Sequence, residues 1–492
     1  MTAAVWLALA IYAVLGIAVA AASRRRLGEG AGEFYLAGRR VGGVVSALSY
    51  GATTYSAFMM VGLVGLTYAG GVGALGFELI YLSGLGLVVI FGPRFWLVGQ
   101  RFGYMTPSAM LGDRYASPSL ATITALACCV FLVPYSAVQL MGIGYLLSGV
   151  SGGAIPFPVG ILIGAGFTLA WALVAGLRSV LWTDVLQVAI MLVTSLIAVA
   201  FVIAALGGPG SFIATVEAER GAWLSLPGPG LFRLETFMAL TLPWFFFSIS
   251  NPQVSQRLYT TASLGAMRTM IAGFLVLGFV YTMVSIVFGF SALALLPELD
   301  NPDLATAELI SSQVIPTSVS VVLIVGIIAA AVSTVDSILL TLAAMVSHDV
   351  YRPWSARGAR GTREVLAAKL VVVILAVIAV AFASLRLDLI SILSVAASIG
   401  LLVTVPTIIG AFFWRRGTAA GAITSILVTG LAVIGMQLGG LKPLGIAPAF
   451  WSAGLSTLLF VGVSLLTRRR DGDRAHAFID ELRTRLDEHN IR

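Results

Sequence analysis

Long apolar runs recur along almost the whole chain, and each is long enough to cross a lipid bilayer as a helix. A spanning helix needs about 20 apolar residues, because each residue advances about 1.5 Å through an apolar layer about 30 Å thick. By this criterion we count about thirteen spans, at residues 3–23, 43–69, 72–98, 119–149, 155–175, 179–206, 235–253, 268–296, 315–347, 364–384, 388–414, 418–439 and 448–467. The sequence therefore predicts an all-α polytopic membrane protein embedded in a lipid bilayer.

Composition agrees with this class and excludes others. Charged residues make up 10% of the 492 residues, whereas a soluble domain carries about 25%. The net charge of +7 does not predict a nucleic-acid partner, because the Arg residues lie in short loops between apolar runs. No nucleophile–base pair is visible, so neither a catalytic site nor an enzyme is expected. The sequence does not predict an oligomeric state.

The loop charges predict how the chain sits in the membrane. Most Arg residues, Arg257 among them, fall on the same side of the predicted spans. Loops rich in Lys and Arg stay cytoplasmic. We therefore expect a cell (plasma) membrane protein with its N-terminus outside and its C-terminus in the cytoplasm. The first apolar run has its basic cluster after it, the reverse of a cleavable signal peptide, so we expect a retained helix.

One predicted span carries a polar face that includes an acid. Residues 326–352 read GIIAAAVSTVDSILLTLAAMVSHDVYR. At about 100° per residue, Ser333, Thr334 and Ser337 share one helix face with Asp336 at its edge. A carboxylate at membrane depth costs roughly 2.5–3.5 kcal/mol on insertion scales, so it normally faces a cavity, a partner or an ion. Hard cations prefer oxygen ligands, which favours a cation site. The alternative is a buried acid satisfied by neighbouring hydroxyls.

Two other spans place oxygen atoms at a similar depth. The second span contains SYGATTYSAF (residues 49–58), and an unwound turn there would free carbonyl oxygens for a cation. Small residues for close helix packing are the alternative. The other span is 179–206, in which Asp184 lies roughly 10 Å from the cytoplasmic end of the helix. Asp336 lies roughly 15 Å from the cytoplasmic end of its own helix. Two acids in one layer suit a monovalent cation, whereas unpaired acids would take up protons.

Candidate solute contacts lie on several of the predicted spans. The seventh predicted span is bracketed by Pro243 and Pro252, and interrupted segments at matched places in two halves point to a binding site. The candidates, each with a packing or interfacial role as the alternative, are Thr54, Ser56, Glu78, Tyr135, Trp244, Ser248 and Ser394.

Four stretches together resemble the sodium/solute symporter family, the sodium-coupled carriers of proline, pantothenate, sugars and sialic acid. They are FYLAGRRVGG, AGLRSVLWTDVLQ, NPQVSQRLYTTASLGAMR and AAAVSTVDSILLTLAAMVSHDVY, and the likeness covers roughly residues 33–416. One departure is Ala262, where the family usually has Lys.

The resemblance implies a LeuT-type fold with two inverted repeats of five helices. The expected parts are an extra N-terminal helix and loop (1–42), a first repeat (43–206), an extracellular loop (207–234), a second repeat (235–416), two C-terminal helices (417–467) and a cytoplasmic tail (468–492). We expect the tail to be a solvated or surface-lying helix.

The resemblance also implies ion ligands. The common sodium site of the family would use backbone oxygens of Ala52, Tyr55 and Ala330 with the hydroxyls of Ser333 and Thr334. A second sodium, present in some members, would use Asp184, Asp336 and Ser337. Many members have Ser rather than Asp at the position of Asp336, so this extra acid would strengthen that site or favour proton coupling.

The function implied is sodium-coupled symport of a small organic solute by alternating access. Thr54 stands where proline carriers have Asp, and Phe58 and Met59 stand where sugar carriers have polar residues, which argues against both solutes. An organic acid, a vitamin or an amino acid is expected instead. The alternatives are a proton-coupled symporter, a channel or a sensory membrane module.

Overall fold

The protein is described by a computed structural model that covers residues 2–24, 31–352, 362–386, 390–467 and 472–491. Within these residues the regular secondary structure is helical, apart from one isolated bridge between Val41 and Thr261. In the same residues ten helices are long and apolar enough to cross a membrane, or eleven when one bent pair counts as a single span. The expected number of thirteen is therefore not confirmed. Two of the expected spans correspond to shorter helices, at Phe157–Leu173 and at α11.

The element bounds are as follows. The longer helical segments are α1 (Thr2–Arg24), α3 (Gly43–Thr54) followed by η2 (Phe58–Leu63) and α4 (Val64–Gly70), α5 (Gly73–Ser83), α6 (Leu85–Phe102), α8 (Pro118–Val150), α9 (Phe157–Ala205), α11 (Leu234–Ser250), α13 (Leu264–Leu295), α15 (Thr317–Met345), α17 (Thr362–Ala383), α18 (Ile390–Leu401), α19 (Val405–Phe413), α20 (Ala419–Leu438) and α21 (Pro448–Leu466). The shorter ones are α2 (Ala31–Leu36), η1 (Ala37–Arg39), α7 (Pro107–Arg114), α10 (Pro209–Arg220), η3 (Gly221–Leu224), α12 (Pro252–Ser255), η4 (Gln256–Tyr259), η5 (Pro302–Leu304), α14 (Ala305–Ser311), η6 (Val346–Tyr351), η7 (Leu402–Thr404), η8 (Pro443–Gly445) and α22 (Gly472–Glu488).

Local sequence signals set several helix starts. Thr106 and Ser117 cap α7 and α8 by accepting a hydrogen bond from the backbone N–H three residues on, and each is followed by a proline. This arrangement satisfies an N–H that the first turn leaves without a helical partner, and proline fits the first helical position.

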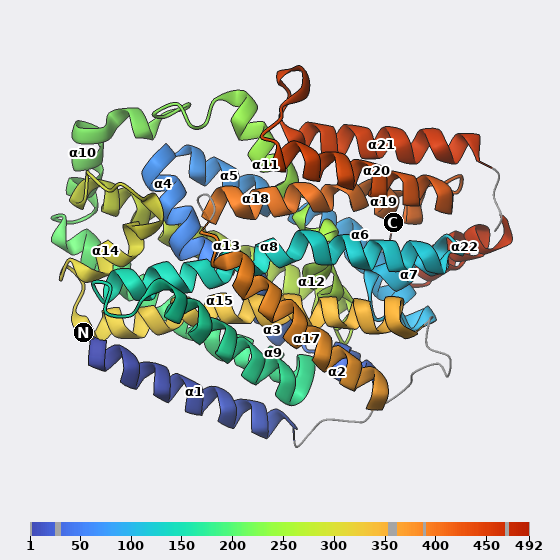
Figure 1. Cartoon of the computed structure of the whole chain (residues 1–492), viewed down its shortest axis with the longest axis horizontal. Coiled ribbons are helices and arrows are strands. Elements are labelled where there is room, and N and C mark those ends of the chain that lie inside the picture. The colour runs from blue at the N-terminus through green and yellow to red at the C-terminus, as the bar shows by residue number, and fades with distance from the viewer. Residues whose placement is uncertain (1, 25–30, 353–361, 387–389, 468–471, 492) are drawn as a thin grey trace.

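Helix α15 forms the centre of the bundle. In its most apolar stretch 83% of the residues are buried, against 28% for α1 and for α21. It packs against α9, α8 and α3. In Figure 1, α1 runs along one edge of the bundle, with α20 and α21 on the opposite edge. The polar face predicted for α15 is therefore enclosed by protein rather than by lipid.

Two helices are interrupted, as the sequence predicts. Helix α3 ends at Thr54, Tyr55 is extended, and the chain then turns by 55° into the segment Phe58–Gly70. Helix α11 ends at Ser250, and Asn251 is likewise extended before α12. The chain bends again within α9 at Gly176, whose φ of +60° suits glycine. A Cβ there would lie 2.7 Å from the carbonyl oxygen of Phe34.

The two ends of the bundle carry different short helices. Helices α10 and α14 lie at the same end as the N-terminus, and α22 lies at the other, with α7 on that side (Figure 1). The apolar side chains of α22 are buried, at Phe478, Ile479, Leu482 and Leu486. Phe478 stacks on Phe102 of α6, and Glu481 pairs with Arg101 at 2.8 Å. The tail helix is thus docked on the bundle.

Candidate functional site

Helix α15 meets the end of α3 through a cluster of oxygen atoms. Ser333 Oγ lies 3.1 Å from the carbonyl oxygen of Ala52 and 2.8 Å from that of Ala330. Thr334 Oγ1 lies 3.1 Å from the Ala52 oxygen and 3.3 Å from the Ala330 oxygen. Both side chains are fully buried. Four oxygens from two helices therefore converge, a donor set that suits a hard monovalent cation.

The sequence explains why these oxygens are available. Ser and Thr inside a helix bond back to the carbonyl three or four residues earlier, which here is Ala330. The carbonyl of Ala52 lies in the last turn of α3, where helical partners run out because the helix stops at Thr54. Tyr55 follows in an extended conformation and donates its N–H to the oxygen of Gly51 at 2.6 Å.

A second polar cluster lies further along α3 and α15 and includes a side chain of α9. Asp184 of α9 accepts a hydrogen bond from Ser49 Oγ at 2.6 Å. Thr53 and Ser337 are 3.2 Å apart through their hydroxyls. Asp336 is fully buried, and neither of its carboxylate oxygens has a hydrogen-bond partner in the described part of the chain. Polar side chains of α3, α9 and α15 therefore meet in this cluster, and their role as ion ligands stays a prediction.

Arg257 enters this second cluster, although the sequence placed it in a cytoplasmic loop. Its side chain is 2% exposed. One guanidinium nitrogen donates to Thr53 Oγ1 at 2.9 Å and to Ser337 Oγ at 2.7 Å, and it lies 3.6 Å from Asp184 Oδ2. Expecting Arg257 at the membrane surface was wrong. The chain turns back at Asn251 into α12 and η4, and this turn carries Arg257 inward.

A small cavity brings together four of the predicted solute contacts. Thr54, Glu78, Tyr135 and Trp244 line it, and the rest of its wall consists of Tyr55, Phe58, Met59, Tyr81 and Phe247. The free space is about 10 Å³, roughly the room that one water needs. Glu78 is 1% exposed, so its side chain is enclosed by protein, and its depth in the membrane stays a prediction.

The other three predicted solute contacts lie outside the lining of this cavity. Ser56 Oγ accepts from the N–H of Phe58 at 3.2 Å, and Ser394 donates to the carbonyl of Ile390 at 2.8 Å. Ser248 is buried one turn beyond Trp244. The Ser56 hydroxyl bonds the first residue of η2 and the Ser394 hydroxyl bonds its own helix, which periodicity alone does not distinguish from a binding role.

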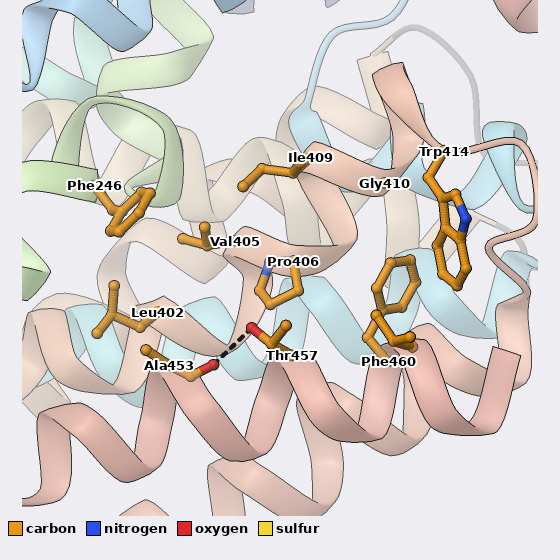
Figure 2. Close-up of a pocket in the computed structure, with 11 residues that line it drawn as sticks. Phe246, Leu402, Val405, Pro406, Ile409, Gly410, Trp414, Ala453, Thr457 and Phe460 are labelled. Atoms are coloured by element: carbon orange, nitrogen blue, oxygen red, sulfur yellow. Dashed lines mark hydrogen bonds between the residues drawn. The ribbon is translucent and has the colours of Figure 1, made fainter. Parts of the chain in front are cut away.

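A larger groove of about 470 Å³ lies between α11, α19 and α21. Figure 2 shows its lining, which is almost entirely apolar, with the Thr457 hydroxyl already bonded to the carbonyl of Ala453 at 2.7 Å. No charged side chain lines this groove. The small cavity beside the helix break is therefore the better candidate for solute recognition.

Comparisons with known proteins agree with this geometry. Residues 34–430 match the sodium:solute symporter family. The sodium/pantothenate symporter of Escherichia coli (strain K12) is 27% identical over 463 residues, covering 91% of this chain and 93% of that protein. The sodium/proline symporter of Haemophilus influenzae is 22% identical over 476 residues, covering 91% of both chains.

Solved structures share the fold. A substrate-bound, outward-open Na⁺-coupled sialic acid symporter has a TM-score of 0.80 at 18% identity, over 95% of this chain and 98% of that one. A nucleobase-cation-symport-1 family transporter in a closed conformation has a TM-score of 0.58 at 15% identity, over 91% and 98% of the two chains. The all-α, LeuT-type class expected from the sequence is confirmed.

Proposed function

Because this chain belongs to the sodium:solute symporter family, we propose that it is a secondary transporter in which sodium entry drives uptake of a small organic solute. Sodium is the co-transported ion. The relatives named above are transporters rather than enzymes, and we assign no catalytic residue to this chain.

The observation that supports this proposal most directly is the set of oxygens around Ala52. In our proposal sodium binds to the carbonyl oxygens of Ala52, Tyr55 and Ala330 and to the hydroxyls of Ser333 and Thr334. A cation held by both α3 and α15 fixes the end of the broken helix. Tyr55 continues from that end into the wall of the small cavity, so sodium binding favours the conformation that accepts solute.

The available free energy is adequate for accumulation. A tenfold sodium gradient supplies about 1.4 kcal/mol per ion. A membrane potential of 100 mV adds about 2.3 kcal/mol per charge. Together these would concentrate a neutral solute a few hundredfold for each sodium ion carried.

A second cation site is also part of the proposal, at Asp184, Asp336 and Ser337. Arg257 holds Ser337 by a hydrogen bond and lies near Asp184. A second sodium would therefore bind there only when the guanidinium moves away. This competition would set how many sodium ions accompany each solute.

We place this multi-pass protein in the cell membrane with its N-terminus outside. The distribution of Arg residues supports this orientation. The position of α22 at the end opposite the N-terminus (Figure 1) supports placing the tail helix and the N-terminus on opposite sides.

Replacing the two hydroxyls tests the first sodium site. We expect Ser333→Ala with Thr334→Ala to abolish sodium-stimulated uptake and to weaken ²²Na⁺ binding by tenfold or more, since each hydrogen-bond-type contact to a charge contributes about 1.5–3 kcal/mol. Purified protein in proteoliposomes, with sodium or potassium outside, provides the measurement.

Ser320→Ala is the matched control, because Ser320 is buried in the same helix and bonds to the carbonyls of Ile310 and Ile315. It should leave sodium binding unchanged. Normal sodium-driven uptake by the double variant would remove the assigned site. Uptake that ignores sodium but follows a pH gradient would select the proton-coupled alternative.

A further inference from the structure

Glu78 lies within a wall of aromatic rings. Trp244 occupies its centre, with ring centroids 5.2 Å from Phe58, 5.2 Å from Phe77 and 5.2 Å from Phe247. Tyr81 lies 5.6 Å from Phe247. Helix α5 supplies both the acid and two of these rings, since Phe77, Glu78 and Tyr81 fall within one helical turn. The rings and the carboxylate therefore belong to one wall.

The carboxylate of Glu78 has no cation to balance it among the residues that line the cavity. Neither Lys nor Arg is found in that lining, and Glu78 Oε2 has no hydrogen-bond partner among the described residues. The polar groups of Trp244 and Tyr55 face the same carboxyl group. A buried acid at membrane depth is costly unless it meets a positive charge.

Aromatic faces also attract a positively charged ligand. The π-electrons of Trp, Tyr and Phe draw a cation to within about 6 Å of the ring centre, most strongly when water is excluded. Quaternary ammonium groups are recognised in this way because they have no N–H to donate. The hydroxyl of Thr54 already donates to the carbonyl of Tyr50 at 2.8 Å, whereas the hydroxyls of Tyr55 and Tyr81 in the same lining have no hydrogen-bond partner among the described residues.

We propose that the transported solute carries a positive charge, an alkylammonium group that sits against Trp244 and is neutralised by Glu78. This inference rests on the proposed function, because it names the class of solute for the same cavity. Of the three classes expected from the sequence, it removes the simple anionic organic acid, which carries no positive charge to balance Glu78. The cation also gains from the membrane potential on entry, by the same charge argument as sodium.

The closed form of the cavity fits a gated site. Its free volume of about 10 Å³ does not admit an ammonium group larger than water. The rings from α5, α8 and α11 must separate before solute enters. The break after Thr54 and the break at Asn251 allow the segments that carry them to tilt.

A pair of probes that differ only in charge tests the proposal. The probes are choline and its uncharged carbon isostere 3,3-dimethylbutan-1-ol, with tetramethylammonium as a smaller cation. Their binding to the purified full-length chain is measured by thermal shift and calorimetry at constant NaCl. We expect choline or tetramethylammonium to bind at least tenfold more tightly than the isostere. Binding of neither cation, or equal binding of the isostere, would overturn the proposal.

Single-residue variants test whether the cation binds at Glu78 and Trp244. Glu78→Gln should weaken cation binding at least tenfold while leaving the isostere unaffected, and Trp244→Leu should weaken it more than Trp244→Phe. Glu364→Gln is the matched control, because Glu364 is another buried acid with an oxygen lacking a hydrogen-bond partner in the described residues, and it does not line the cavity. Choline binding that persists in Glu78→Gln would also overturn the proposal.

Binding of ²²Na⁺ in the same samples separates the two claims. Loss of sodium binding in the Ser333 and Thr334 double variant tests the sodium site whatever the ammonium result. Sodium binding without cation recognition would leave sodium coupling standing and remove the charged-solute inference.

Discussion

Arg257 is the residue that most changes the picture of the ion layer. It is a buried positive charge beside Asp184, with Asp336 as a further acid acting on it electrostatically. Removing one member of a buried ion pair typically costs about 3–5 kcal/mol, because the other charge is left uncompensated. A sodium ion would supply the same missing charge, so the energetic role of Arg257 should depend on the salt present.

We therefore expect Arg257→Gln to lose about 3–5 kcal/mol of stability in a sodium-free medium. A large part should return in NaCl, because sodium can occupy the space beside Asp184. Melting temperatures in NaCl and in N-methyl-D-glucamine chloride at equal ionic strength give the comparison. Adding Asp184→Asn should abolish the difference between the salts. An equal loss in both media would contradict competition between Arg257 and sodium.

At the scale of elements, close contacts fix the positions of α11 and α18. Between α5 and α6, Gly84 lies so close to α11 that a Cβ would be 2.2 Å from the carbonyl oxygen of Phe245. Elsewhere in the bundle, Asp303 of η5 accepts the N–H of Ile390, the first residue of α18, at 2.9 Å. The first of these contacts acts on α11, which carries Trp244 of the solute cavity.

Gly84→Ala should push α11 outward and cost about 1–3 kcal/mol, the usual penalty for overpacking. Because α11 carries Trp244, solute binding should weaken as well. Gly86→Ala is the control, since a Cβ at Gly86 meets nothing within 4 Å and the change should be neutral or stabilising by up to about 1 kcal/mol. Denaturation midpoints and uptake rates measure the two effects, and equal behaviour of the variants would argue against close packing at Gly84.

Asp303 predicts a pH dependence of stability. Burial raises the pKa of its carboxyl group from 3.8 to about 6, against the opposing effect of the Ile390 N–H. Between these values the folded protein binds more protons than the unfolded chain, so stability falls as the pH rises from about 4 to about 6. The contribution is up to about 3 kcal/mol. It is fully present below pH 4.

Asp303→Asn retains an oxygen acceptor for the Ile390 N–H and removes the titration. Its stability should change less than that of the parent chain between pH 4.5 and 7.5. Chemical denaturation in detergent at the two pH values provides the check, and parallel curves for both proteins would exclude Asp303 as the source.

At the scale of the whole molecule, a buried core is flanked by less buried helices. Helix α15 is enclosed, while α1 and the pair α20 and α21 lie along opposite edges (Figure 1). The proposed ion ligands and the proposed solute cavity both lie within the core. The orientation of the bundle in the membrane is then set by the charges of the loops at its two ends.

Membrane-impermeant maleimide tests the orientation. Ser225→Cys should react in intact cells, and Arg416→Cys should react only after permeabilisation, because we place the two residues on opposite sides. Both positions are exposed, whereas the two cysteines of the chain, Cys128 and Cys129, are buried and half-buried. The reverse pattern would invert the topology.

Local chemistry made much of this protein predictable. Apolar length and loop charge depend on neighbouring residues alone, so most spans follow from the sequence. The helix break at Tyr55 followed from a cluster of small and polar residues. The approach of Ser333 and Thr334 to Ala52 followed from the family pattern, although their role in sodium binding stays a prediction.

Contacts between distant segments required the tertiary structure. Arg257 looked like a loop charge, because charge alone gives no depth, and the turn at Asn251 carries it inside. Glu78 looked as much like an interfacial acid as a buried one, and the rings of α8 and α11 that enclose it come from far along the chain. The sequence by itself determined most of the long apolar helices and which oxygens they carry. Packing between those segments decided which charges meet, because burial depends on neighbours that sequence distance does not reveal.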